Sequence, residues 1–203
     1  MLRILRVLPL LALFGAGAAQ ADYLWLQRDG ASMRVQAGQL HKPLAVLPAL
    51  QAPRALWAEG RELPVVAQAN ALVLAPPAAG DLRFSASLPG EQGVFTYHHA
   101  RFGRSETRAV NLLELVPTQA EGNSFRLMFQ GRPVAASQVH VDTSQGWMRT
   151  LVPDRDGTVM LATPFPGLYV LEVTARLDNG SVVLDGKTYL DVRHTATLSF
   201  EVR

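Results

Sequence analysis

Residues 148–173, MRTLVPDRDGTVMLATPFPGLYVLEV, constrain the fold of this chain more than any other stretch. Three apolar or alternating runs, at 148–152, 158–162 and 168–173, are separated by two groups of turn residues. One group ends in Asp156-Gly157 and the other in Pro166-Gly167, and both suit tight turns because glycine adopts positive φ without strain. The sequence therefore predicts three consecutive antiparallel strands that form the centre of a small β-sandwich.

Short strands with turn signals recur along the rest of the chain. Residues 22–27 and 32–36 flank an Asp-Gly turn, and residues 81–88 alternate apolar and polar side chains as a half-buried strand does. We expect an all-β protein of two small β-sandwich domains, Ig-like or carboxypeptidase-regulatory-like. The expected parts are an N-terminal β domain at 22–97, a polar linker at 98–109 and a C-terminal Ig-like sandwich at 110–203.

The first 21 residues have the three parts of a secretory signal peptide. Arg3 and Arg6 form a basic start, residues 7–14 are apolar, and Ala19-Gln20-Ala21 is a small-residue cleavage site. The alternative is a membrane anchor, but the apolar run is shorter than the roughly 20 residues that span a bilayer. We therefore expect cleavage before Asp22, a periplasmic or secreted protein, and no stable membrane insertion afterwards.

Charge and composition narrow the classes of partner and reaction. Removal of Arg3 and Arg6 lowers Lys+Arg from 19 to 17, which equals the 17 Asp and Glu residues. A formally neutral chain without a basic run does not suit nucleic acid or an anionic membrane surface. The chain has no cysteine, and it lacks the G-x-S-x-G, H-E-x-x-H and glycine-rich phosphate-loop motifs. We therefore do not expect an enzyme.

Several motifs together carry a resemblance to a known family. They are FQGRPVAASQVHV, DRDGTVML, PFPGLYVLEV and DVRHTATLSFEV, with Trp25-Leu26 close to the expected mature N-terminus. In these motifs the chain resembles the periplasmic domain of unknown function 4198 family, whose members are often found beside nickel and cobalt uptake transporters. The resemblance implies a metal role and a membrane transporter as partner. Where that family has an N-terminal histidine this chain has Asp22, whose amine and carboxylate can still chelate, with oxygen as a harder donor.

Asp22 and three histidines are the candidate metal ligands. His98 and His99 are adjacent, and neighbours in an extended segment point to opposite faces, so both bind one ion only if the backbone turns there. The alternative for this pair is a solvated polar linker. His194 follows Asp191 just before the last strand, and it is either a ligand supported by that carboxylate or the donor of a strand-end hydrogen bond.

Other patterns have simpler interpretations. Asp154 and Asp156 resemble the start of a calcium loop, but the later acidic ligands of such a loop are missing, so this segment predicts a turn. His140 alternates with valines and is expected to face solvent. Trp147, after Gly146, is the tryptophan most expected to be exposed, where it can bind a glycan or a protein.

Two functions remain open at this point. The first is a periplasmic accessory protein that binds Ni²⁺, Co²⁺ or a chelate of either ion and supports uptake by a membrane transporter. The second is a non-catalytic interaction module that binds a partner protein or a glycan through exposed strand edges or Trp147.

Overall fold

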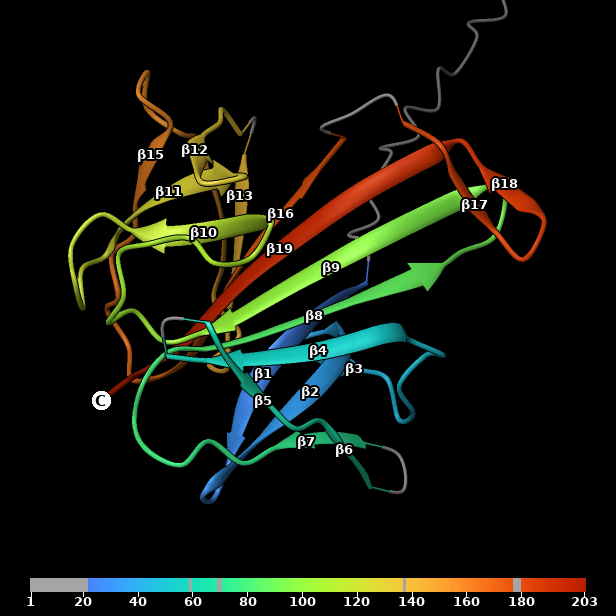
Figure 1. Cartoon of the computed structure of the whole chain (residues 1–203). Helices are drawn as coiled ribbons and strands as arrows, with labels where there is room; N and C mark the ends of the chain where they lie inside the picture. The colour runs from blue at the N-terminus through green and yellow to red at the C-terminus, as the bar shows by residue number, and fades with distance from the viewer. Residues whose placement is uncertain (1–21, 59, 69–70, 137, 177–179) are drawn as a thin grey trace, which may run out of the picture.

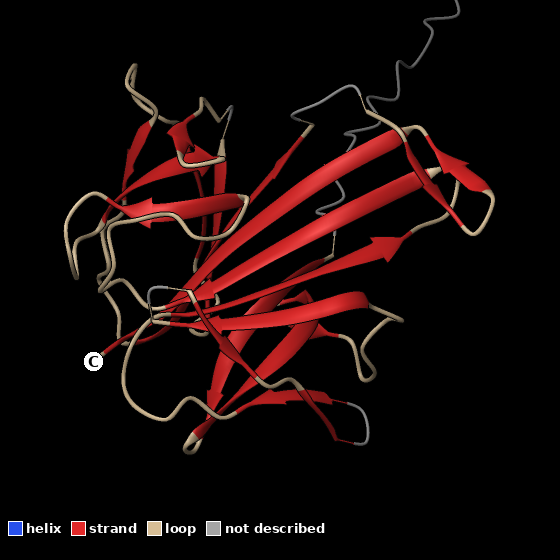
Figure 2. Ribbon diagram, viewed as in Figure 1, coloured by secondary structure: helices blue, strands red, loops and turns tan. Residues whose placement is uncertain are grey.

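The structure is a computed structural model that describes residues 22–203 except 59, 69–70, 137 and 177–179. Every regular element of the described part is a strand, so the prediction of an all-β fold is confirmed (Figure 2). Accordingly, no helix in this part is long and apolar enough to cross a membrane. The strands, in chain order, are β1 (Tyr23–Asp29), β2 (Ser32–Gln39), β3 (Lys42–Pro43), β4 (Gln51–Trp57), β5 (Arg61–Leu63), β6 (Val66–Gln68), β7 (Ala71–Leu74), β8 (Leu82–Pro89), β9 (Val94–Phe102), β10 (Leu113–Pro117), β11 (Ser124–Phe129), β12 (Arg132–Pro133), β13 (Val139–Thr143), β14 (Met148–Leu151), β15 (Thr158–Met160), β16 (Gly167–Ala175), β17 (Val182–Leu184), β18 (Lys187–Tyr189) and β19 (Asp191–Val202).

An eight-stranded sheet forms the centre of the molecule (Figure 1). Its strand order is β14-β13-β16-β19-β9-β8-β4-β5. All neighbouring strands in it are antiparallel except β9 and β19, which run parallel to each other. Because β4, β5, β8 and β9 precede residue 110 and the other four strands follow it, the two halves of the chain share one sheet.

The predicted linker at residues 98–109 is wrong for residues 98–102. These residues end β9, in the middle of the central sheet. Their polarity has another physical cause, since Arg101 is fully buried and its charge is paired with buried carboxylates. A solvated linker and a buried ion cluster give the same composition, and only the fold distinguishes them.

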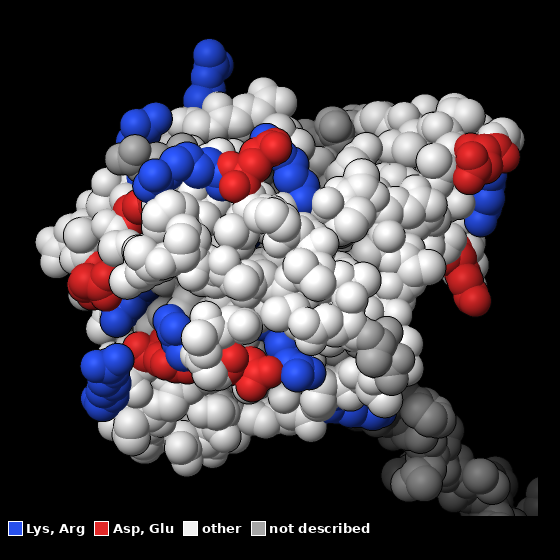
Figure 3. Space-filling model, turned by 60° about the horizontal axis from the view of Figure 1, so that its bottom comes forward, with Lys and Arg blue, Asp and Glu red and all other residues white. Residues whose placement is uncertain are grey.

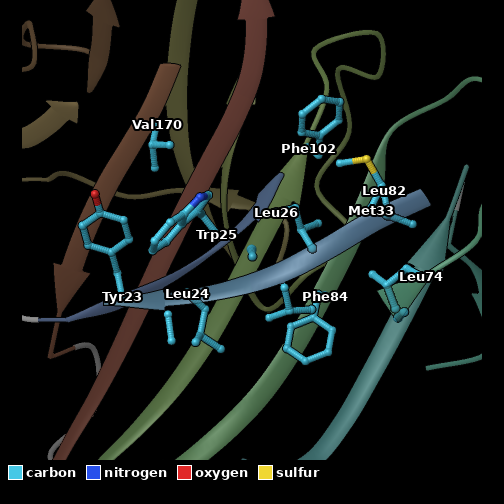
Figure 4. Packing of buried hydrophobic residues seen from close by; sticks show 14 of the residues in the cluster. Tyr23, Leu24, Trp25, Leu26, Met33, Leu74, Leu82, Phe84, Phe102 and Val170 are labelled. Atoms are coloured by element: carbon cyan, nitrogen blue, oxygen red, sulfur yellow. The ribbon is translucent and has the colours of Figure 1, made fainter. Parts of the chain in front are cut away.

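Two smaller sheets pack on opposite faces of the central sheet, so the protein has two β-sandwich cores with one layer in common. One face is covered by β1-β2-β7-β6, with β3 paired to β2, and the other by β10-β11-β12, with β15 paired to β11. In the first core Tyr23 and Trp25 of β1 lie beside Val170 of β16 (Figure 4). The second core includes Leu113, Phe125 and Phe200 among others. A separate hairpin, β17-β18, lies beside one end of β9 and β19 (Figure 1).

Strands form at all three predicted runs of residues 148–173, but they do not pair with one another. β14 pairs with β13, β15 pairs with β11 in the second small sheet, and β16 pairs with β13 and β19. The chain therefore crosses from the central sheet to the small sheet and back. The turns at 153–157 and 163–166 connect the two layers of a sandwich. The pattern of apolar residues predicts where these strands lie, but it is the same whether consecutive strands pair in one sheet or lie in two packed sheets.

Candidate functional site

Strand β9 places His98 and His99 on opposite faces of the central sheet, as expected for neighbours in a strand. His98 lies in register with Ala86 and Thr195, and Ala86 belongs to the first core. His99 lies in register with Ala196, which belongs to the second core. Both histidines are buried, with exposed fractions of 4% and 7%. The central sheet therefore separates them, and they do not share a ligand.

His99 and His194 are brought together on the second face. Because β9 and β19 are parallel neighbours, the His194 ring stacks between Tyr97 and His99. The ring centres of His194 and Tyr97 are 5.0 Å apart, and those of His194 and His99 are 5.8 Å apart with ring planes only 5° from parallel. Phe129 of β11 meets the His194 ring edge-on at 5.8 Å. Two imidazoles thus lie side by side in aromatic surroundings.

Both buried histidines of β9 are neutral near pH 7. Burial lowers the pKa of His98 to about 4. Burial, together with the nearby His194 and His98, lowers the pKa of His99 to about 3. A neutral imidazole has a ring nitrogen whose lone pair can bind a metal ion.

The ring nitrogens of His98 and His99 accept and donate no hydrogen bond within the described part of the chain. A buried polar group without a partner costs about 1–3 kcal/mol, and such groups often mark a bound water, an ion or a functional role. His99 therefore has ligand capacity that the described residues do not use.

Asp191 does not support His194, so the first of the two alternatives left open for this histidine is wrong. Residues three apart in a strand point to opposite faces, and the carboxylate of Asp191 accepts hydrogen bonds from Arg176 at 2.7 and 2.9 Å and from Arg193 at 2.5 Å. These bonds, with Arg176 contributing most, hold the pKa of Asp191 well below its usual range. Asp191 belongs to a surface ion cluster on the other face of β19.

Asp22 is also separate from the histidine pair. It is exposed and lies directly before β1, whose sheet covers the face opposite to that of His99 and His194. Of the four predicted ligands, the structure therefore brings together two, His99 and His194.

A buried ion cluster was missed by sequence reasoning. Glu114 accepts hydrogen bonds from Arg83 at 3.0 Å, from Arg101 at 2.8 Å and from the backbone N–H groups of Val110 and Asn111. Arg101 also pairs with Asp81, and Arg83 with Glu106. Burial alone would raise the pKa of Asp81, but Arg101 and bonds from residues 105 and 106 lower it below its usual value. The only signal in the sequence was that Arg83 alternates with the apolar residues of its strand. Polar residues on a solvent-exposed strand face show the same alternation.

The remaining candidates lie at the surface or at its edge. His140 has a ring nitrogen 3.0 Å from Gln138 and the other 3.3 Å from Thr150. Trp147, expected to be exposed, is partly buried against the second core, where its ring meets Phe165. Asp156 accepts a hydrogen bond from the Thr158 N–H within the turn that was predicted there.

The site is a pair of ligands and not a larger cluster. Among the residues that the structure describes, no group of three or more His, Cys, Asp or Glu side chains is placed to hold a metal ion. The pair offers imidazole nitrogens beside aromatic rings, and the His99 ring is neutral near pH 7. A comparison of the chain with protein-family models and with curated protein sequences found no match.

Proposed function

We propose that the protein is a periplasmic accessory protein that binds a transition-metal ion, nickel or cobalt being the ions implied by the resemblance, and supports its uptake by a membrane transporter. The binding residues in this proposal are His99 and His194. The observation that carries it is the proximity of their rings, whose centres are 5.8 Å apart. Two imidazoles bound to one ion at a metal–nitrogen distance of about 2.0 Å place their ring centres roughly 5–6 Å apart, depending on the angle at the metal.

The state of the His99 ring supports the same proposal. Its nitrogens make no hydrogen bond with described residues, and its low pKa leaves it neutral, so a metal ion does not have to displace a proton. Imidazole suits nickel, copper and zinc. The periplasmic location and the transporter rest on the signal-peptide pattern and on the resemblance, and they are proposed on those grounds.

Calorimetry with Ni²⁺, Co²⁺, Cu²⁺ and Zn²⁺ tests this function. The protein must begin at Asp22 without a tag, so that its terminal amine is free. We expect one ion per chain, and we expect affinity to fall at least tenfold in His99→Phe and in His194→Phe, which keep a planar ring in the stack. His140→Gln and Asp22→Asn are the controls, because neither residue lies in the pair.

Two results would overturn the proposal. One is the absence of any binding tighter than millimolar by wild-type protein whose circular dichroism shows a folded β structure. The other is binding that both His→Phe variants leave unchanged while the Asp22 variant loses it. In that second case the carboxylate of Asp22, and not the histidine pair, holds the ion.

A second candidate function, a non-catalytic interaction module, is favoured by the surface around β6. All three residues of β6 are exposed, and in the described part of the chain β6 pairs only with β7. Two grooves of about 580 and 220 Å³ adjoin it, lined largely by apolar residues that include Leu63, Val65, Leu47 and Leu50. The face in Figure 3 carries a few small groups of mixed charge and a wide uncharged area.

An extended peptide can add to such an edge as a further strand. Screening the protein against an immobilised peptide library tests this function. A charge on the edge opposes strand addition, so Ala67→Lys is expected to abolish capture. Val183→Lys, on the separate β17-β18 hairpin, is expected to leave it unchanged. Capture that both variants lose equally, or no capture at all, would contradict this second function.

A further inference from the structure

A cleft lined by arginines and glutamates lies where β9 and β19 end, at the end of the central sheet that carries the C-terminus (Figure 1). Its volume is about 370 Å³, near the lower end of the range of about 300–1,000 Å³ that small-molecule sites occupy. Its walls come from separate parts of the chain, namely Arg28 of β1, residues 102–104, Glu121 and residues 200–201. Neither histidine of the pair lines it.

The side chain of Arg104 is held in position within this cleft. Its guanidinium lies over the ring of Phe200, 4.1 Å from the ring centre. Its Nη1 donates hydrogen bonds to the carbonyl oxygen of Gly122 at 3.2 Å and to Oδ1 of Asn123. A guanidinium that is stacked and hydrogen-bonded has already lost much of its rotamer freedom, so a ligand that binds to it pays little for ordering it.

The other edge of this guanidinium is not used by the fold. Within the described part of the chain, Nε and Nη2 of Arg104 donate no hydrogen bond, and Arg104 forms no ion pair. Burial lowers the pKa of Arg104, and the charge of Glu121 acts in the opposite direction. The Nε–Nη2 edge is a fork that can hold an oxyanion through two parallel bonds, and an anion there would stabilise a charge that burial destabilises.

The other charges of the cleft limit the charge of the ligand. Arg28 is a second cation, and its Nε lies 3.9 Å from Oε2 of Glu201. Glu121 and Glu201 are carboxylates in the same cleft, whereas the charge of Asp81, which also borders it, is paired with Arg101. Like charges at close range repel, so the two glutamates disfavour a doubly charged anion such as hydrogen phosphate. A singly charged carboxylate fits this balance better.

We infer that this cleft binds a small organic carboxylate, whose two oxygen atoms accept hydrogen bonds from Nε and Nη2 of Arg104. Arg28 adds positive potential on the wall formed by β1. The inference is independent of the proposed metal-binding function, because the two sites share no residue.

Titration with benzoate and with benzamide, its uncharged analogue of similar shape, tests the inference on the chain that begins at Asp22. Two-dimensional NMR of ¹⁵N-labelled protein measures the affinity, and the shifted amide signals of residues 103, 104 and 121 locate the site. We expect one benzoate per chain and weaker binding of both benzamide and inorganic phosphate at pH 8. Arg104→Gln is expected to lower the affinity for benzoate by roughly tenfold or more, because a charge-assisted hydrogen-bond donor is lost.

Two further variants separate a binding role of Arg104 from a structural one. Glu121→Gln removes a negative charge at an exposed position and is expected to raise the affinity for benzoate severalfold. Arg149→Gln is the matched control, because Arg149 also lies over an aromatic ring, that of Trp147, but outside the cleft. It is expected to leave benzoate binding unchanged.

Three results would overturn the inference. They are the absence of saturable benzoate binding by the folded protein, equal affinities for benzoate and benzamide, and equal effects of Arg104→Gln and Arg149→Gln. A benzoate affinity that falls in Glu121→Gln would contradict the assigned charge of the ligand and overturn the inference as well. None of these results bears on metal binding by His99 and His194, which is measured separately.

Discussion

The side-chain hydroxyl of Thr197, on β19, donates a hydrogen bond of 2.7 Å to the backbone carbonyl oxygen of Leu24, on β1. Two residues further along both strands, Ser199 donates to the carbonyl of Leu26 at the same distance. Since β1 is the end strand of its sheet, these carbonyls have no neighbouring strand to bond. Hydroxyl groups of the central sheet take that place, so the first and last strands are joined by side chain to backbone bonds.

Thr197→Val tests how much this hydrogen bond contributes to the stability of the fold. Valine has nearly the shape of threonine but leaves the buried carbonyl of Leu24 without a donor, so we expect a loss of about 1–3 kcal/mol in the free energy of unfolding. Urea unfolding followed by circular dichroism measures it. Thr188→Val, at an exposed position of β18, is the matched control and is expected to change stability by less than about 0.5 kcal/mol. Equal effects of the two variants would rule out a special role for the hydroxyl.

Removal of the Glu114 charge is expected to be far more damaging than removal of a surface charge. Glu114→Gln leaves two buried guanidinium groups without their common carboxylate, and loss of one partner from a buried ion pair costs about 3–5 kcal/mol. Glu62→Gln breaks the exposed pair with Arg54, which is expected to cost less than about 1 kcal/mol. Thermal and urea unfolding of the two variants give the comparison, and similar losses would contradict the assignment of Glu114 as the centre of the cluster.

The fold class could be predicted from the sequence because the alternation of apolar residues in strands and the residues of turns are local features of the sequence. Residues 81–88 show their buried face through Leu82, Phe84 and Ala86, and these residues lie in the first core. The pairing of β9 with β19 could not be predicted from the sequence, because it joins residues about a hundred positions apart. A period of two identifies a strand but not its partner strand. The choice between one shared sheet and two linked domains depends on that pairing.

Only part of the candidate site could be predicted from the sequence, for the same reason. Opposite orientations of His98 and His99 follow from strand geometry alone. The meeting of His99 with His194 requires the parallel register of β9 and β19, and the separation of Asp22 requires knowing which face β1 covers. The ion cluster of Arg83 and Glu114 was hidden because a polar strand face buried by a second sheet looks like a solvated one.

Gly103→Ala is expected to disturb the ion cluster as well as the backbone. Gly103 has φ of +104°, and an added Cβ would overlap Asp81 Oδ1 and lie 3.0 Å from its Cγ. Gly131 also has positive φ, +73°, but an added Cβ there meets nothing within 4 Å. Gly131→Ala is thus expected to cost only the backbone strain of about 1–2 kcal/mol, and Gly103→Ala clearly more. Urea unfolding of both variants measures the difference, and equal losses would show that Asp81 moves aside without cost.

His98 is expected to make folding stability fall as the pH is lowered from about 6.5 towards 4. Burial lowers its pKa to about 4 in the folded protein, against 6.5 for an ordinary histidine. Between these values the unfolded chain binds a proton at this position and the folded chain does not, so acid favours unfolding. The effect of a shift of this size is on the order of 3 kcal/mol when fully developed.

Replacement of the imidazole in His98→Leu is expected to flatten this part of the stability curve, measured by urea unfolding at pH 7, 6, 5 and 4.5. His41→Leu, in an exposed loop, controls for loss of an imidazole outside the core, and a His98 variant that keeps the wild-type slope would show that the proton uptake occurs elsewhere.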